Sequence, residues 1–105
     1  MTRKPGWMLV VAADAVRRMA LFGLVEREGL RATVADDGHA ALAMLRAEPF
    51  DLVLLDSSSP LLDPAAILTE IRADPILRRL PVLVLAEPTD HDELARALRQ
   101  LMNNA

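Results

Sequence analysis

The chain of 105 residues has no cysteine and no tyrosine, and aromatic side chains make up only 3% of it. Without cysteine the chain can form neither a disulfide nor a thiolate metal site. Because aromatic rings are so few, Leu, Val, Ala, Ile and Met must fill its core. Hydrophobic residues reach 52% of the chain, enough for one core, and this composition favours layered Val/Leu strands and Ala/Leu helices.

The sequence also lacks a long apolar segment and an excess of basic charge. No apolar run approaches the roughly 20 residues of a membrane span. Acidic and basic residues are mixed along the chain, with a net charge of −3. We therefore expect neither membrane insertion nor nucleic-acid binding. The apolar start is better explained as a first core strand than as a secretory signal, and we expect a cytoplasmic protein.

Apolar residues alternate between strand and helix periods along the chain. Strands are predicted at 7–12, 31–35, 52–55 and 82–85, and helices at 15–28, 39–47, from 63 to about 73 and at 90–102. In the first helix, Val16, Met19, Ala20 and Gly23 share one apolar face. Four strand–helix units in succession predict one α/β domain over 1–105, with a doubly wound parallel sheet and helices on both faces.

The third predicted strand ends on an acid, Asp56, which the loop Ser57-Ser58-Ser59-Pro60 follows. A buried parallel strand that delivers a carboxylate to the carboxyl edge of its sheet is typical of a functional site. The first strand reaches the same edge with Ala12 and Ala13, where such a site needs further acids. Asp14, the next residue, is better explained as the N-cap of the first helix. The pattern retains the scaffold of a site and lacks most of its chemistry.

Several motifs, in order, resemble the receiver domain of bacterial two-component response regulators, whose single-domain members include the chemotaxis regulators. From Met8 to about Gln100 they comprise the apolar strand before Asp14, Ala35-x-x-Gly38-x-x-Ala41-Leu42, Asp51-Leu52-Val53-Leu54-Leu55-Asp56, Pro60-x-x-Asp63 and Ile71-Arg72-Ala73-Asp74-Pro75 leading to Leu80-Pro81-Val82. The resemblance implies a flavodoxin-like fold. The chain is about one strand–helix unit too short, so we expect four strands in the order 2-1-3-4 in place of five.

Two alignments account for the missing unit. In the favoured one, the fourth helix and fifth strand are deleted, and Val82 to Leu85 lead directly into the family's last helix. In the other, the fourth helix is kept and everything beyond it is lost.

The resemblance also assigns roles to positions at the sheet edge. In this family an acidic pair after the first strand holds Mg²⁺ beside a phosphoacceptor Asp. Asp56 matches the phosphoacceptor, whereas Ala12 and Ala13 match the acidic pair. Ala86 matches the Ser or Thr that senses the phosphoryl group. The lysine of the fifth strand has no counterpart, because Lys4 is the only lysine of the chain.

These departures predict a degenerate receiver, or pseudo-receiver. It would be a non-enzymatic, cofactor-free interaction module of bacterial two-component signalling, independent of phosphorylation, whose partner is a histidine kinase or another two-component protein. The alternative is an active receiver that is phosphorylated on Asp56 and uses Asp14 and weakly bound Mg²⁺. A nucleotide-binding domain is disfavoured, because no glycine-rich phosphate loop follows a strand.

Loss of the fifth strand would leave the fourth strand at the edge of the sheet. This strand is apolar and carries no charge, so its protection against edge pairing is weak. We therefore predict a homodimer or a partner-binding surface there, formed by Val82, Leu83, Val84, Leu85, Leu94 and Leu98.

Overall fold

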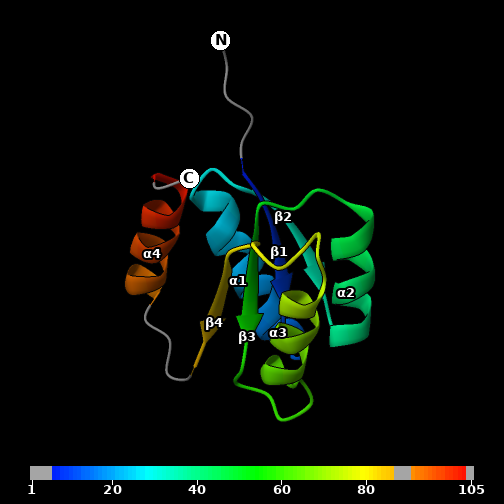
Figure 1. The fold of residues 1–105 in the computed structure, drawn as a ribbon. Helices are drawn as coiled ribbons and strands as arrows, with labels where there is room; N and C mark the ends of the chain where they lie inside the picture. Colours follow the sequence, from blue (N-terminus) through cyan, green and yellow to red (C-terminus); the bar gives the residue numbers. More distant parts are fainter. Residues whose placement is uncertain (1–5, 87–90, 104–105) are drawn as a thin grey trace.

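A computed structural model describes residues 6–86 and 91–103 of the chain (Figure 1). Strands and helices alternate in the order β1 Trp7–Val11, α1 Ala15–Arg27, β2 Arg31–Ala35, α2 Gly38–Ala47, β3 Leu52–Asp56, α3 Pro64–Ala73, β4 Val82–Leu85 and α4 His91–Asn103. The predicted elements are all present, with ends that differ by one or two residues. The start predicted for the last helix, residue 90, lies outside the described residues.

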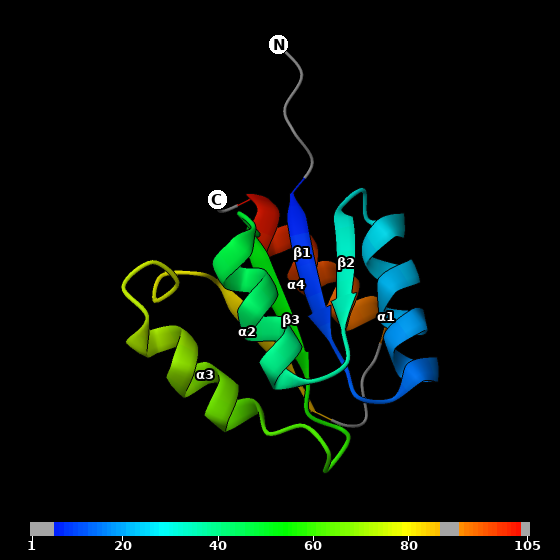
Figure 2. The same cartoon turned by 90° about the vertical axis from the view of Figure 1, so that its right-hand side faces the viewer.

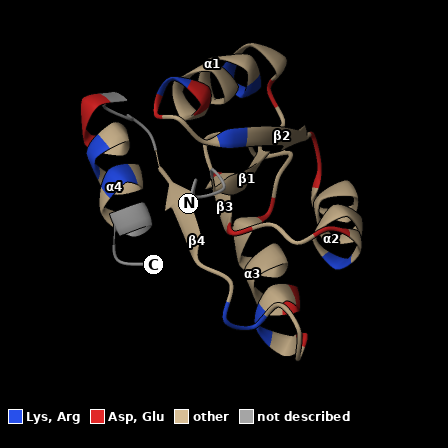
Figure 3. Ribbon diagram, turned by 90° about the horizontal axis from the view of Figure 1, so that it is seen from above, with Lys and Arg blue, Asp and Glu red and all other residues tan. Residues whose placement is uncertain are grey.

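The four strands form one parallel sheet in the order β2-β1-β3-β4. This confirms the predicted doubly wound fold and its strand order. Figure 3 shows α1 and α4 on one face of the sheet and α2 and α3 on the other. The two central strands, β1 and β3, are covered on both faces, so their side chains are buried almost throughout.

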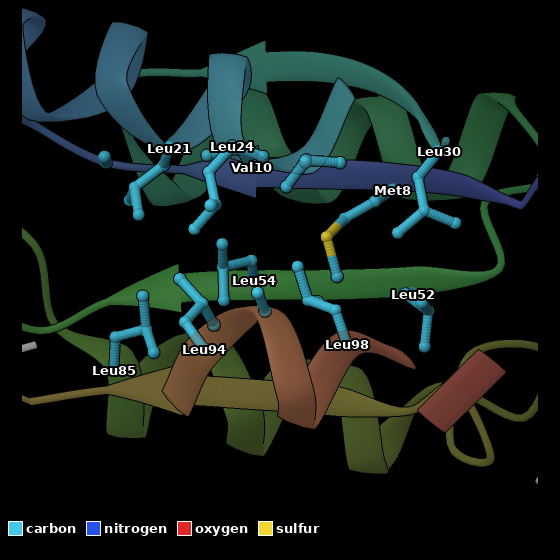
Figure 4. Close-up of a cluster of buried hydrophobic side chains, with 13 residues drawn as sticks. Met8, Val10, Leu21, Leu24, Leu30, Leu52, Leu54, Leu85, Leu94 and Leu98 are labelled. Carbon is cyan, nitrogen blue, oxygen red and sulfur yellow. The ribbon is translucent and has the colours of Figure 1, made fainter. Parts of the chain in front are cut away.

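Each face of the sheet has its own apolar cluster. On the side of α1 and α4, Val10 and Leu54 from the sheet contact helix residues that include Leu24 and Leu98 (Figure 4). On the side of α2 and α3, Figure 2 shows the two helices in front of the strands, and Val11 and Val53 pack against residues that include Ile71. Alternate residues of one strand therefore fill both clusters, as the period of a strand requires.

Helix α4 lies beside α1, and an ion pair of 2.6 Å between Arg99 and Glu28 joins them. A right-handed crossover from β4 to a further strand beyond it would run over the opposite face, as α3 does between β3 and β4. The position of α4 is therefore that of a terminal helix folded back over the sheet. This placement agrees with the favoured alignment, in which the fourth helix and fifth strand are deleted.

The orientation predicted for α1 was wrong. Its buried residues are Leu21, Leu24 and Val25, whereas Val16 and Met19, on the predicted apolar face, are 80% and 61% exposed. Helix α1 is turned so that the stripe containing Leu21 and Leu24 faces the sheet. That rotation decides which of its arginines reaches the sheet edge.

Aspartates begin α1, α2 and α3, which leave the carboxyl edge of the sheet. Asp14, Asp37 and Asp63 each accept a hydrogen bond from a backbone N–H three residues on, at 2.8, 2.7 and 3.1 Å. A carboxylate at this position satisfies N–H groups that have no partner in the helix and favours the positive end of the helix dipole. These three acids therefore cap helices, as expected for Asp14.

None of the helices in the described part of the chain is both long enough and apolar enough to cross a membrane.

Candidate functional site

Asp56 ends β3 at the carboxyl edge of the sheet, and its side chain is completely buried. It is the one polar residue among the described buried residues. Its Oδ1 accepts hydrogen bonds from Arg17 Nε at 3.0 Å and from the Ser58 backbone N–H at 3.2 Å. Its Oδ2 accepts one from the Ser58 hydroxyl at 2.8 Å. Both carboxylate oxygens are therefore occupied by groups of the chain itself.

Arg17 lies in the first turn of α1, and its side chain is only 18% exposed. A cation is normally disfavoured in the first turn, where the helix dipole is positive. Here Arg17 occupies that position because it continues the buried stripe of Leu21 and Leu24 by one turn, toward Asp56. The resulting ion pair supplies the opposite charge that a buried carboxylate needs.

Arg18, the next residue, contacts the end of β1. Its Nη1 donates hydrogen bonds to the Ala12 and Ala13 carbonyl oxygens at 2.9 and 3.4 Å. The Ala12 side chain is fully buried in the apolar cluster of the α1 and α4 face, and Ala13 packs against the cluster of the other face. The segment that matches the family's acidic pair thus presents methyl groups, and an arginine holds its carbonyls.

The residues at this edge do not fit a magnesium ion. Mg²⁺ prefers carboxylate oxygens in near-octahedral geometry. Ala12 and Ala13 supply none, Asp14 caps α1, and both Asp56 oxygens have protein partners. Within residues 6–86 and 91–103, no three His, Asp or Glu side chains converge into a metal site.

The serine loop after β3 connects Asp56 to the neighbouring strand. The backbone N–H and the hydroxyl of Ser57 both donate hydrogen bonds to the Leu85 carbonyl of β4. Ser58 makes the contacts to Asp56. The loop therefore joins β3 to β4 through Ser57 and closes over the buried carboxylate through Ser58.

Ala86 directly follows β4 and is exposed. Its methyl group offers no hydroxyl at the position that the resemblance matches to the family's phosphoryl-sensing Ser or Thr. The residues that follow, 87–90, lie outside the described part of the chain.

Arg17 is the functional residue that sequence reasoning missed. The predicted apolar face of Val16, Met19, Ala20 and Gly23 turns the Arg17 side chain away from the sheet, which is wrong, because this side chain is 18% exposed and pairs with Asp56. Asp56 could dispense with a charged partner only if water reached it, and its side chain has no exposed surface. The signal was the spacing of Arg17, Leu21 and Leu24, which places all three on one side of a helix.

The predicted interaction surface is only partly exposed. Val84 is 40% exposed, and Val82 and Leu83 are half-buried at the edge of the sheet. Leu85, at the end of β4, is 8% exposed, and Leu94 and Leu98 are 3% and 0% exposed, because they anchor α4 on the sheet. The inclusion of these three leucines in a free surface was therefore wrong.

Residues 8–105 match the sequence profile of the response regulator receiver domain. The chain is 32% identical to chemotaxis protein CheY-3 of Vibrio cholerae over 97 residues, which covers 91% of this chain and 75% of that protein. It is also 32% identical to part of the sensor histidine kinase AruS of Pseudomonas aeruginosa, over 90% of this chain and 12% of that protein.

Solved structures show the same fold. The receiver domain of a signal transduction histidine kinase from Syntrophus aciditrophicus superposes with a TM-score of 0.87 at 21% identity, covering 95% of this chain and 92% of that one. The receiver domain of sensor histidine kinase PA1611 from Pseudomonas aeruginosa, which holds a magnesium ion in its active-site cleft, gives 0.83 at 24% identity, covering 95% and 99%. By its sequence match and its fold, the chain belongs to the response regulator receiver family.

Proposed function

We propose that this chain is a pseudo-receiver, which acts by protein contact in two-component signalling and does not depend on phosphorylation of Asp56. The observation that carries the proposal is the ion pair of Arg17 with the completely buried Asp56 carboxylate. An arginine of the chain binds the carboxylate that an active receiver would present to a metal ion and a phosphoryl donor.

Phosphorylation of an aspartate requires one carboxylate oxygen to attack phosphorus, with positive charge nearby to offset the negative charge that gathers there. In this chain Asp56 Oδ1 is held by Arg17 and Ser58, and Oδ2 by Ser58. Access to either oxygen requires these bonds to break and the Ser58 loop to open. The arginine also neutralises the carboxylate that a metal ion would otherwise bind.

The exposed surface supports a role in protein contact. Val16 and Met19 on α1, and Leu61 in the loop after β3, are 80%, 61% and 85% exposed. Large apolar side chains in solvent around a functional edge are typical of interaction surfaces. The family relationship favours a histidine kinase or another two-component protein as the partner, in the cytoplasm.

The experiment is incubation of the purified chain with acetyl phosphate and Mg²⁺, followed by intact-mass spectrometry. We expect no phosphorylated species, while an active receiver in a parallel reaction acquires one phosphoryl group. An acyl phosphate that appears on this chain and disappears in Asp56→Asn would contradict the proposal and establish the alternative, an active phosphoacceptor.

A second measurement tests contact directly. If a kinase partner binds the chain, Asp56→Asn should leave the dissociation constant nearly unchanged, because the carboxylate is buried beneath Arg17 and Ser58. Binding that depends on phosphorylation of the wild-type chain would contradict the proposed role.

A further inference from the structure

The outer edge of β4 has the backbone pattern of a strand that can pair with another. In the part of the chain that the structure describes, β4 pairs with β3 alone. The Pro81 and Leu85 carbonyls accept hydrogen bonds from the Val53 and Ser57 N–H groups. The backbone N–H and C=O groups of successive strand residues point alternately to the two sides. The backbone groups of Leu83 therefore also point toward β3, and those of Val82 and Val84 point away from it.

Pro81 does not protect this edge. Because its carbonyl accepts a hydrogen bond from β3, its ring nitrogen also lies on the β3 side. The N–H group that proline lacks would therefore have pointed toward β3 and not toward the free edge. The side chains along the edge are Val82 and Val84, without charge, and Val84 is 40% exposed. The usual devices against edge pairing, such as an outward-facing lysine or proline, are therefore absent from residues 81–85.

We propose that two copies of this chain pair through β4 in an antiparallel, two-fold symmetric arrangement centred on Leu83. In this register Val82 lies opposite Val84 of the second copy, and Val84 opposite Val82. Each of these pairs exchanges both N–H···O bonds, because both residues direct their backbone groups outward. The symmetry thus gives a partner to all four outward-facing groups of each strand, and the two sheets join into one.

Charge at the two ends of the strand favours the antiparallel direction. The turn before β4 carries exposed Arg78 and Arg79, and the first turn of α4 after it carries exposed Asp92 and Glu93 (Figure 3). Antiparallel pairing brings the basic end of one copy toward the acidic end of the other. Parallel pairing would place like charges together.

The joined sheet also brings the two α4 helices side by side on one face. Arg99 faces α1 through its ion pair with Glu28. Ala97 lies about 200° away around the helix, on the flank toward the free edge. A small residue on this flank allows two helices to approach closely. Because β4 has only four residues, the dimer is expected to be weak and dependent on concentration.

Sedimentation velocity of the wild-type chain, from micromolar to about 1 mM, tests the association. We expect a shift from monomer to dimer with concentration. Val84→Lys should keep the protein monomeric over the same range, because it places a charge in the paired edge. Ala43→Lys is the matched control, since it also replaces an apolar side chain with lysine, at an exposed position on α2, and should dimerise like the wild type.

Cysteine cross-linking tests the register, because the wild-type chain contains no cysteine. At the two-fold axis the Leu83 Cα atoms lie about 4.5 Å apart, within the range of a disulfide. Leu83→Cys should therefore form a covalent dimer on mild oxidation. In Val84→Cys the two cysteines lie two residues out of register, beyond disulfide reach, and should cross-link poorly.

A wild-type chain that stays monomeric to about 1 mM would overturn the proposal and leave the edge to an extended segment of a different protein. So would a dimer that persists in Val84→Lys, or cross-linking that is as efficient at 84 as at 83. If Val84→Lys does not fold, as judged by circular dichroism, the two cysteine variants decide between these outcomes.

Discussion

Arg17 Nε lies 3.0 Å from Asp56 Oδ1, across a separation of 39 residues in the chain. This contact links the first turn of α1 to the carboxyl end of β3. It gives a fully buried carboxylate a permanent positive partner within the same molecule. The positive charge beside this carboxylate thus comes from a side chain of α1.

A double-mutant cycle can measure this ion pair. Arg17→Met keeps most of the aliphatic bulk but leaves Asp56 buried without its counter-ion, and should lower the free energy of unfolding by about 2–4 kcal/mol. Asp56→Asn keeps the shape and can still bond to Ser58, so its cost should be about 1 kcal/mol. Combined, the two changes should cost clearly less than their sum in urea unfolding.

Arg18→Met is the control for that cycle. Arg18 bonds to neutral carbonyls of Ala12 and Ala13, so its loss should be additive with Asp56→Asn. Additivity of Arg17→Met with Asp56→Asn would show that the contact contributes nothing specific to stability.

Restoring the acidic pair should create a dependence on magnesium. When the register of β1 and β3 is continued by one residue, Ala12 stands opposite Asp56, on the same face of the sheet. In Ala12→Asp/Ala13→Asp, two carboxylates about 4 Å apart repel by about 4 kcal/mol at an effective dielectric constant of 20, before any relaxation. We expect a lower melting temperature without metal and a rise on addition of Mg²⁺.

The wild-type chain provides the comparison for this variant. Its melting temperature should not change with Mg²⁺ beyond the effect of ionic strength, which NaCl can match. A double variant that melts identically with and without Mg²⁺ would show that the three side chains do not converge.

The ion pair between α1 and α4 should make stability depend on pH. A hydrogen bond from Arg99 lowers the pKa of Glu28 below its ordinary value of 4.5. As the pH falls, the unfolded chain therefore binds the proton first. The contribution of Glu28 is present above its unfolded pKa and is lost as the pH falls through the lower folded value.

Urea unfolding at a series of pH values checks this effect. Glu28→Gln should flatten the loss of stability on acidification, whereas Glu26→Gln, an exposed acid on the same helix, should keep the wild-type profile. The idea fails if Glu28→Gln has the same pH profile as the wild type.

Helices α2 and α3 lie so close at Gly38 that we expect any side chain there to destabilise the fold. A Cβ at this position would lie 2.8 Å from Ile67 Cγ1 and 3.0 Å from its Cδ1. Ile67 is buried and cannot move freely, so Gly38→Ala should destabilise the fold by about 1–2 kcal/mol despite the better helix propensity of alanine. In an Ile67→Ala background, the same change should become neutral or stabilising in thermal unfolding.

Local signals were sufficient to predict the strands and helices of the fold. The apolar run before Asp56 indicates a buried strand, Asp63-Pro64 indicates a helix start, and Asp14 caps α1 as its residue type suggests. Each signal acts over a few residues. The succession of strand–helix units predicts a parallel sheet with helices on both faces, whereas the strand order 2-1-3-4 was implied by the resemblance to the receiver family.

The site depended on the rotation of α1, which the sequence pattern misrepresents. Val16 and Met19 are apolar but lie in solvent, while Arg17 is polar but lies against the sheet. Hydrophobicity alone therefore turns the helix the wrong way, and the same error hides the partner of Asp56. The spacing of Arg17, Leu21 and Leu24 places them on one side of the helix, but the contact with Asp56 is a tertiary one between a helix and a strand, which that spacing alone does not identify.

The direction of α4 sets the geometry of any larger protein that contains this domain. Helix α4 runs back along the sheet, so that Arg99 meets Glu28 at the end of α1, on the side of the sheet where β1 begins (Figure 1). The first strand and the last helix thus have their outer ends at the amino edge. A domain, tag or surface linker that is fused at either terminus therefore extends from the amino edge, on the side of the sheet opposite Asp56. The carboxyl edge then stays accessible to a binding protein.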